Sequence, residues 1–251
     1  MAEIYAVINQ KGGVAKSTTA QILGNAIRHK GHSVLFIDLD PQGNLTYGMG
    51  IDTPDAGIYE VLTKRKRALD TITTTEQGDV LASTPSLTMI EHELQNELGK
   101  EYRLKEALDT LSARYDYIII DTPPSLSTLS INALTSANKV IIPTQTDIYS
   151  IQGLAQLSQT IETVRKYTND ALEVAGILIT RYDKRTILTQ QLTEMLENTA
   201  SMINSKVFDA RIREAIAVKE AQAMRDDLLT YAPKANVTAD YLAFIDELGI
   251  K

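Results

Sequence analysis

The sequence has no cysteine and no tryptophan among its 251 residues. The absence of cysteine excludes disulfide bonds, thiolate zinc sites, cysteine-ligated iron–sulfur clusters and cysteine nucleophiles, and it is typical of a reducing cytoplasm. Long apolar runs are also missing, because no stretch approaches the roughly 20 residues that a membrane-spanning helix needs. The chain enters an expected strand at Ile4 without the basic segment and long apolar core of a secretory signal. We therefore expect a cytoplasmic protein.

An excess of positive charge is absent too. The chain has 25 lysines and arginines against 32 aspartates and glutamates, which gives a formal net charge of −7. This balance excludes a histone-like protein that coats nucleic acid through bulk charge. Residues 181–225 differ, because they hold eight basic and six acidic residues. Any contact with nucleic acid is therefore expected to come from a local patch in this segment, although a solvated helical surface explains the same charges.

Short apolar runs alternate with longer segments in which apolar residues recur every three or four positions. This pattern predicts an α/β fold, a doubly wound and mostly parallel sheet flanked by helices, in a single domain over residues 1–251. The strands are expected at Ile4–Ile8, Ser33–Asp38, Val80–Ser83, Tyr117–Asp121, Lys139–Pro143 and Val174–Thr180, with a weaker one near Lys206–Phe208. The helices are expected at Ser17–Lys30, Met89–Arg114, Leu126–Ser136, Ile151–Tyr167 and Thr186–Met202. Ligands of such folds bind at the carboxyl ends of the strands.

A glycine-rich loop joins the first expected strand to the first expected helix. Gly12 and Gly13 supply flexible backbone, and Lys16 and Ser17 stand where a phosphate-binding loop has its lysine and hydroxyl. Ala15 replaces the usual last glycine, which we interpret as a mild departure that a negative φ would tolerate. An ordinary glycine-rich junction is the alternative. The register of strand, loop, Lys-Ser pair and helix favours the phosphate loop.

The segment Lys11–Thr19 resembles the deviant Walker A motif of the ParA/MinD family of ATPases. The resemblance implies that ATP is bound by Lys11, Gly12, Gly13, Val14, Ala15, Lys16, Ser17 and Thr18. In that family the extra lysine, which Lys11 matches, reaches the nucleotide of a second subunit, so the ATP-bound form is a sandwich homodimer. A cation inserted across an interface also stabilises charge during phosphoryl transfer, which gives catalytic roles to Lys11 and Lys16.

Acidic residues follow two of the expected strands. The segment Asp38–Gln42 resembles the family motif in which the second aspartate orients the attacking water, so Asp40 is the expected hydrolytic residue. Asp38 is expected to support the loop and the outer shell of the metal, or simply to cap an Asp-Pro turn. Asp121 ends an apolar run of Walker B form, and it is expected to hold Mg²⁺ together with Ser17 and Asp40. ATP and Mg²⁺ are thus the expected cofactors.

The resemblance also indicates partners. It implies nonspecific binding of double-stranded DNA by the ATP dimer, with Arg185, Arg213 and Lys219 as the expected contacts. A dimer doubles the basic patch, and phosphate contacts of this kind are sensitive to salt. A centromere-binding ParB-type protein would then stimulate an intrinsically slow hydrolysis and release the dimer from DNA. This reading places the protein in the cytoplasm in association with the nucleoid.

Two other functions are alternatives. One is a MinD-like or polar-positioning ATPase that acts on a protein or membrane, and the other is a P-loop kinase or synthetase of small molecules. Enzymes of the second kind lack the leading Lys11-Gly12-Gly13 signature. The C-terminal segment Ala239–Leu248 is amphipathic but acidic, so we expect it to pack on the domain rather than bind anionic lipid. A first strand that begins at Ile4 leaves no room for an N-terminal helix-turn-helix domain. The sequence therefore favours a small ParA/Soj-type partition ATPase without a membrane partner.

Overall fold

A single twisted sheet organises the computed structural model, which describes residues 2–183, 187–202 and 204–250. Within these residues the strand order is β3-β4-β2-β5-β1-β6-β7-β8. The strands are β1 (Glu3–Val7), β2 (Val34–Asp38), β3 (Ile72–Thr75), β4 (Gly78–Leu81), β5 (Tyr117–Asp121), β6 (Lys139–Thr144), β7 (Glu173–Thr180) and β8 (Val207–Ile212). Every neighbouring pair is parallel except the β3–β4 hairpin. The predicted α/β fold with a mostly parallel sheet is confirmed.

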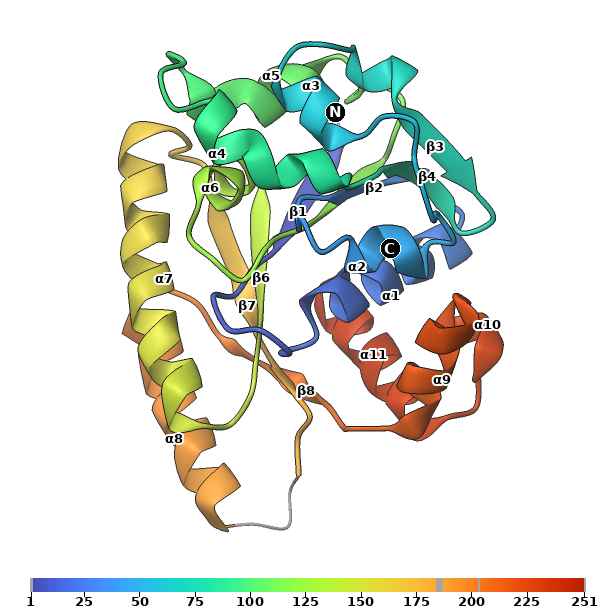
Figure 1. Ribbon diagram of the computed structural model, residues 1–251. Helices are drawn as coiled ribbons and strands as arrows, with labels where there is room; N and C mark the ends of the chain where they lie inside the picture. The colour runs from blue at the N-terminus through green and yellow to red at the C-terminus, as the bar shows by residue number, and fades with distance from the viewer. Residues whose placement is uncertain (1, 184–186, 203, 251) are drawn as a thin grey trace.

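Helices cover both faces of the sheet (Figure 1). One face carries α1 (Lys16–His29), α2 (Asn44–Gly48), α9 (Ile216–Met224), α10 (Leu228–Tyr231) and α11 (Asn236–Glu247). The other face carries α3 (Ile58–Leu62), α4 (Ile90–Glu93), α5 (Arg103–Asp109), α6 (Thr128–Ser136), α7 (Ile148–Tyr167) and α8 (Ile187–Met202). The central strands are buried from both sides, which is why they appear in the sequence as continuous apolar runs.

The register of the central strands positions the polar residues that follow them. Asp38 at the end of β2 lies opposite Asp121 at the end of β5, and Val7 at the end of β1 also lies opposite Asp121. All three strands run in the same direction, so the loops that leave their carboxyl ends meet at one edge of the sheet. The glycine-rich loop after β1 therefore lies beside both aspartates.

Helix and strand boundaries differ from the sequence expectations in a few places. The predicted helix over Met89–Arg114 is wrong, because the chain there forms α4, a turn and then α5. Gly99 interrupts it with a φ of 66°, a left-handed backbone conformation that cannot continue an α-helix. The weak strand expected near Lys206–Phe208 is β8, and it extends to Ile212. The spacing of apolar residues therefore overestimated the length of the helix after Met89 and underestimated the length of β8.

The C-terminal segment packs on the domain, as predicted. Tyr241, Phe244 and Ile245 of α11 are buried against α1 and β8, and the Phe244 ring meets the edge of Phe208 at 5.0 Å between centroids. The apolar stripe of this amphipathic helix is therefore used inside the protein. Across the described residues, no helix combines the length and apolarity required to cross a membrane.

Gly24 of α1 makes a close approach to β2, and it provides a test of this packing. A Cβ at Gly24 would lie 2.1 Å from the Phe36 ring. Alanine is intrinsically the better helix residue by about 1 kcal/mol, but overpacking of a core costs about 1–3 kcal/mol or more. We expect Gly24→Ala to lower the free energy of unfolding by about 2 kcal/mol in urea denaturation.

Gly153 of α7 is the matched control, because a Cβ there would meet nothing within 4 Å. Gly153→Ala should raise the free energy of unfolding by up to about 1 kcal/mol. If the two variants shift stability in the same direction, the contact with Phe36 does not govern this position.

Candidate functional site

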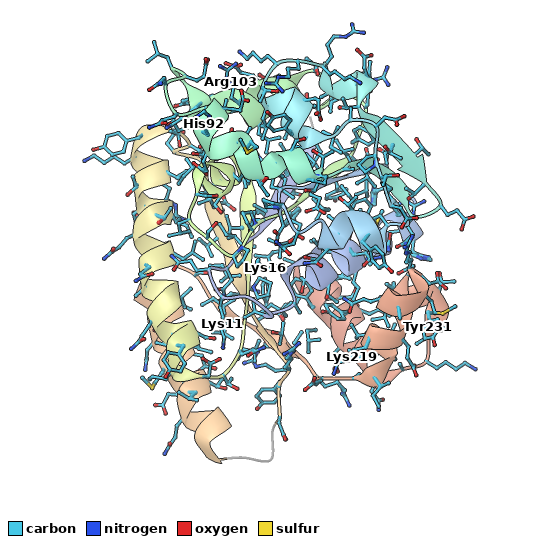
Figure 2. All side chains as sticks on the ribbon, in the orientation of Figure 1. Lys11, Lys16, His92, Arg103, Lys219 and Tyr231 are labelled. Carbon is cyan, nitrogen blue, oxygen red and sulfur yellow. The ribbon has the colours of Figure 1, made fainter. Side chains whose placement is uncertain are left out.

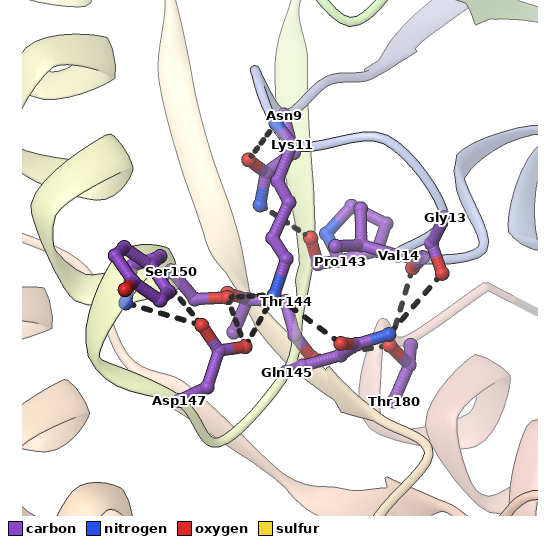
Figure 3. Close-up of polar contacts among 11 residues, drawn as sticks. Asn9, Lys11, Gly13, Val14, Pro143, Thr144, Gln145, Asp147, Ser150 and Thr180 are labelled. Carbon is purple, nitrogen blue, oxygen red and sulfur yellow. Dashed lines mark hydrogen bonds and ion pairs between the residues drawn. The ribbon is translucent and has the colours of Figure 1, made fainter.

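The loop between β1 and α1 is held by the ends of two neighbouring strands. Gln145 Nε2 donates to the Gly13 carbonyl at 3.2 Å, and Thr180 Oγ1 donates to the Val14 carbonyl at 3.1 Å (Figure 3). At the base of the loop, Asn9 Nδ2 donates to the Pro143 carbonyl at 2.7 Å. Gln145 and Thr180 thus occupy carbonyl oxygens of the loop, and the Asn9 side chain attaches the base of the loop to β6. A loop that is braced in this way is organised before any ligand arrives.

Ala15 departs from the sequence expectation. Its φ is 67° and its ψ is 33°, so the expected negative φ is wrong and the residue has a left-handed backbone. A residue with a Cβ in this conformation costs roughly 1–2 kcal/mol relative to the right-handed form. The conformation persists because Ala15 starts α1, where its carbonyl accepts from the Thr19 amide at 2.9 Å. The missing glycine therefore leaves a strained but intact loop.

Lys16 is buried at the bottom of the site. Only 7% of the residue is exposed, and its Nζ donates to the Lys11 carbonyl at 3.1 Å. Burial lowers the pKa of the Lys16 ammonium, while Asp121 and Asp40 favour its charged form. A cation in such a water-poor environment interacts strongly with an incoming anion.

Two buried aspartates end the neighbouring strands β2 and β5, and the charge of Asp121 interacts with that of Lys16. Asp38 and Asp121 are both 0% exposed. Burial raises the pKa of Asp38 to about 6, although three hydrogen bonds favour its charged form. The donors are the Asp40 amide at 3.0 Å, the Thr46 amide at 2.8 Å and the Thr46 hydroxyl at 2.7 Å. Asp38 thus holds the loop that carries Asp40.

The carboxylate of Asp121 can bind a further cation or hydrogen-bond donor. Its Oδ2 is buried and has no hydrogen-bond partner among the described residues. Burial and the neighbouring Asp38 raise the pKa of Asp121 well above its usual range, and a hydrogen bond from Ser17 opposes them. Buried polar atoms are normally paired, so an orphaned carboxylate oxygen next to a hydroxyl indicates a missing cation or water. An oxygen set of this kind fits Mg²⁺, which prefers carboxylates, hydroxyls and water.

The phosphate loop and Asp40 line one pocket of about 580 Å³. Lys16, Ser17 and Asp40 line it on the loop side, and Arg213 and Lys219 line it on the opposite side. Figure 2 shows Lys16 near the middle of the molecule and Lys219 toward α9. The volume is typical of a site for a small molecule or nucleotide. The pocket extends between α2 and α9.

Lys11 does not enter this pocket. Its Nζ lies 2.5 Å from Asp147 Oδ2 and 3.4 Å from Gln145 Oε1 (Figure 3). Asp147 also caps α7, because its Oδ1 accepts from the amides of Tyr149 at 3.1 Å and Ser150 at 3.0 Å. Burial raises the pKa of Asp147, but the hydrogen bonds from Lys11 and Ser150 outweigh it and leave the pKa lowered. The two lysines of the loop therefore face different surroundings.

Two of the residues expected to contact DNA have acidic neighbours. Arg213 binds Asp240 through two nitrogens, at 2.7 and 2.8 Å, and Lys219 lies 3.2 Å from Glu214. Arg185 lies outside the described residues. The roles of all three in DNA binding stay predictions.

Several polar residues at the site were not assigned a role from the sequence. Asn9, Gln145, Thr180 and Asp147 are of this kind, and all but Asn9 lie near the ends of β6 and β7. Their position at or after the ends of predicted strands is the feature of the sequence that could have indicated a role at the site. Gln222 of α9 also reaches the loop helix, and nothing local in the sequence indicates this contact.

Comparison with known proteins agrees with this geometry. A family model described as an AAA domain matches residues 2–174. The sporulation initiation inhibitor protein Soj of Bacillus subtilis is 39% identical over 253 residues, covering 99% of each chain. The chain belongs to the ParA/Soj family of partition ATPases. Another member, the chromosome partitioning protein ParA of Caulobacter vibrioides, is 38% identical and covers 98% of this chain and 93% of its own length.

Solved structures agree with this P-loop ATPase fold. A structure titled cobyrinic acid a,c-diamide synthase from Mycobacterium smegmatis, with bound ATP analog and magnesium, is 33% identical with a TM-score of 0.87, covering 98% of this chain and 93% of that one. A putative plasmid partition protein from Borrelia burgdorferi bound to AMPPNP is 27% identical with a TM-score of 0.83, covering 100% and 99%. The septum site-determining protein MinD of Pyrococcus horikoshii shares the fold at 21% identity and a TM-score of 0.80, with 99% and 96% covered.

Removing the Cβ at residue 15 should relieve the strain in the loop. We expect Ala15→Gly to raise the free energy of unfolding by about 1 kcal/mol, measured by urea denaturation without nucleotide. Ala155→Gly on the exposed side of α7 is the control, and it should lower stability by about 1 kcal/mol. A loss of stability in both variants would contradict the strained conformation of Ala15.

The buried charge of Asp121 should cost stability in the absence of ligand. Asp121→Asn removes this charge and should raise the thermal midpoint by about 2–4 °C at neutral pH, while magnesium-dependent tightening of ATP binding is lost. Asp38→Asn is the matched control. It should lower the midpoint, because the amide nitrogen of asparagine would face either the Thr46 donors or the Asp40 amide. Equal effects of the two substitutions would contradict this distinction between the two aspartates.

Proposed function

We propose that this partition ATPase forms an ATP-bound dimer that binds DNA nonspecifically and is released when a partner stimulates hydrolysis. The observation that carries the proposal is the opposite placement of the two lysines of one loop. Lys16 lies buried inside the pocket, whereas Lys11 lies outside it with 32% of its side chain exposed. A lysine outside its own pocket is available to the nucleotide of a second subunit.

The pocket supplies the groups that ATP and magnesium require. The amides from Gly12 to Thr18 and the Lys16 ammonium would bind the phosphates, and Ser17 and Asp121 would hold Mg²⁺ with Asp40 near it. The metal, when bound, neutralises phosphate oxygens and favours departure of the leaving group. Asp40 would orient the attacking water. Because the site relies on positioning more than on a strong base, hydrolysis is expected to be slow.

Lys11 would change partners when the dimer forms. Its ion pair with Asp147 is about one-third exposed on each side. Such a pair contributes at most about 1 kcal/mol, because water screens it. A triphosphate offers more negative charge than one carboxylate, so the exchange of Asp147 for a partner's phosphates is favourable. This makes the ion pair a resting position for Lys11 before dimerisation.

The basic segment 181–225 would provide the DNA contacts, through Arg185, Arg213 and Lys219 from both subunits. The carboxylates that now pair with Arg213 and Lys219 would be exchanged for DNA phosphates. A centromere-binding ParB-type protein is the expected stimulating partner, and nucleoid association in the cytoplasm is the expected localisation.

A second candidate function is an ATP-dependent synthetase, favoured by the 33% identity to the structure titled as a diamide synthase. Such an enzyme would consume ATP only when a carboxylic acid acceptor is present. The chain has no cysteine, so it cannot release ammonia from glutamine through a thiol nucleophile. Steady ATP hydrolysis without any acceptor favours the partition function over this candidate.

The decisive experiment combines a gel shift on nonspecific duplex DNA with measurements of ATP binding and dimerisation. Wild-type protein should bind DNA only with ATP and should lose affinity between about 50 and 200 mM salt. Lys16→Ala should abolish nucleotide binding. Asp40→Ala should give an ATP-trapped dimer that still binds DNA, whereas Lys11→Ala should bind ATP but fail to dimerise.

The variants separate the parts of the proposal. Equal loss of dimerisation in Lys16→Ala and Asp40→Ala would contradict the role of Asp40. ATP-dependent dimers that never bind DNA would favour the MinD-like alternative, in which the target is a protein or membrane.

A further inference from the structure

Helix α9 makes a direct polar contact with the first turn of α1. Gln222 Nε2 of α9 donates to Thr18 Oγ1 at 2.7 Å, although the two residues are 204 positions apart. Thr18 follows Lys16 and Ser17 in the loop helix, and both Thr18 and Gln222 line the pocket. Gln222 therefore contacts the hydroxyl of a residue in the segment that would bind the phosphates.

Helix α9 is anchored, so the position of Gln222 is well defined. Ala221 is 2% exposed and packs into the core that surrounds α1. Just after the helix, the Arg225 carbonyl accepts from Gln77 Nε2 at 2.9 Å. Gln77 is itself buried, and its Oε1 accepts from Gln21 and Asn25 of α1, at 2.9 Å each. The helix that carries Gln222 is thus attached to α1 through a buried network.

The direction of the hydrogen bond determines what the Thr18 hydroxyl can do. Gln222 donates an N–H, so the hydroxyl oxygen acts as the acceptor and its own proton is left for another group. No contact within the described part of the chain gives that proton an acceptor. Thr18 lines the pocket, where phosphate oxygens would accept the proton of its hydroxyl in a charge-assisted hydrogen bond.

We propose that Gln222 is a positioning residue for the nucleotide. It holds the Thr18 hydroxyl as a donor to the phosphates and thereby couples the position of α9 to nucleotide binding. The inference rests on the proposed function, because it needs a nucleotide in the pocket. The contact lies on the loop helix itself, so it acts on phosphates shared by ATP and ADP. Helix α9 also carries Lys219 on the pocket wall, and nucleotide binding therefore stabilises the orientation of that wall.

Substitutions of Gln222 that keep its size test the proposal. Gln222→Met removes the donor, and it should weaken ATP and ADP binding alike, by about 3- to 10-fold. Gln222→Glu reverses the hydrogen bond, because a carboxylate can only accept the Thr18 proton, and its charge repels the phosphates. It should weaken both nucleotides by more than about 10-fold. Gln159→Glu on the exposed side of α7 is the matched control for charge and should bind as wild type.

A double-mutant cycle with Thr18→Val separates positioning from a general structural role. Dissociation constants are measured by calorimetry with magnesium, at a temperature where circular dichroism shows every variant folded. Gln222→Met should have little further effect once the Thr18 hydroxyl is gone. The same loss of affinity in both backgrounds, or unchanged affinity in Gln222→Met, overturns the inference. Failure of the wild-type protein to bind ATP would instead refute the proposed function.

Discussion

The burial of two neighbouring carboxylates, Asp38 and Asp121, is the constraint on which the rest of the site depends. Parallel strands β2 and β5 bring the two carboxylates opposite each other with no exposed surface. Charges in such a place must be paired or hydrogen-bonded, and the protein meets this need unequally. Asp38 receives three hydrogen bonds from its own loop, whereas one oxygen of Asp121 has no partner in the part of the chain that the structure describes. The site is thus incomplete in charge until a cation and a phosphate chain enter it.

The loop after β1 has a strained backbone at this site. Ala15 keeps a left-handed backbone, and side chains from β6 and β7 hold the carbonyls of Gly13 and Val14. The strained backbone lowers the stability of the protein at the place where a ligand would bind, which is common at functional sites. The same neighbourhood holds Lys11 against Asp147, close to the start of α7. One short loop is therefore connected to three strands and two helices.

Much of this could be predicted from local patterns. Apolar runs of four residues followed by Asp38 or Asp121 predict strands with polar ends, and Lys16-Ser17 before a helical segment predicts a phosphate loop. The break at Gly99 was missed, since apolar spacing on both sides of it imitates one helix. The φ of Ala15 was also missed, because alanine itself favours the opposite sign and the loop's contacts decide otherwise.

Local patterns predict the alternation of the main strands and helices, the phosphate loop and the two aspartates, because these features depend on neighbours within a few positions along the chain. The partner that each polar group meets is set by the tertiary structure alone. Lys11 pairs with Asp147, Thr18 with Gln222 and Arg213 with Asp240, at separations that no local pattern encodes. Such contacts arise from packing of the whole sheet and its helices, so they become visible only when the chain has folded.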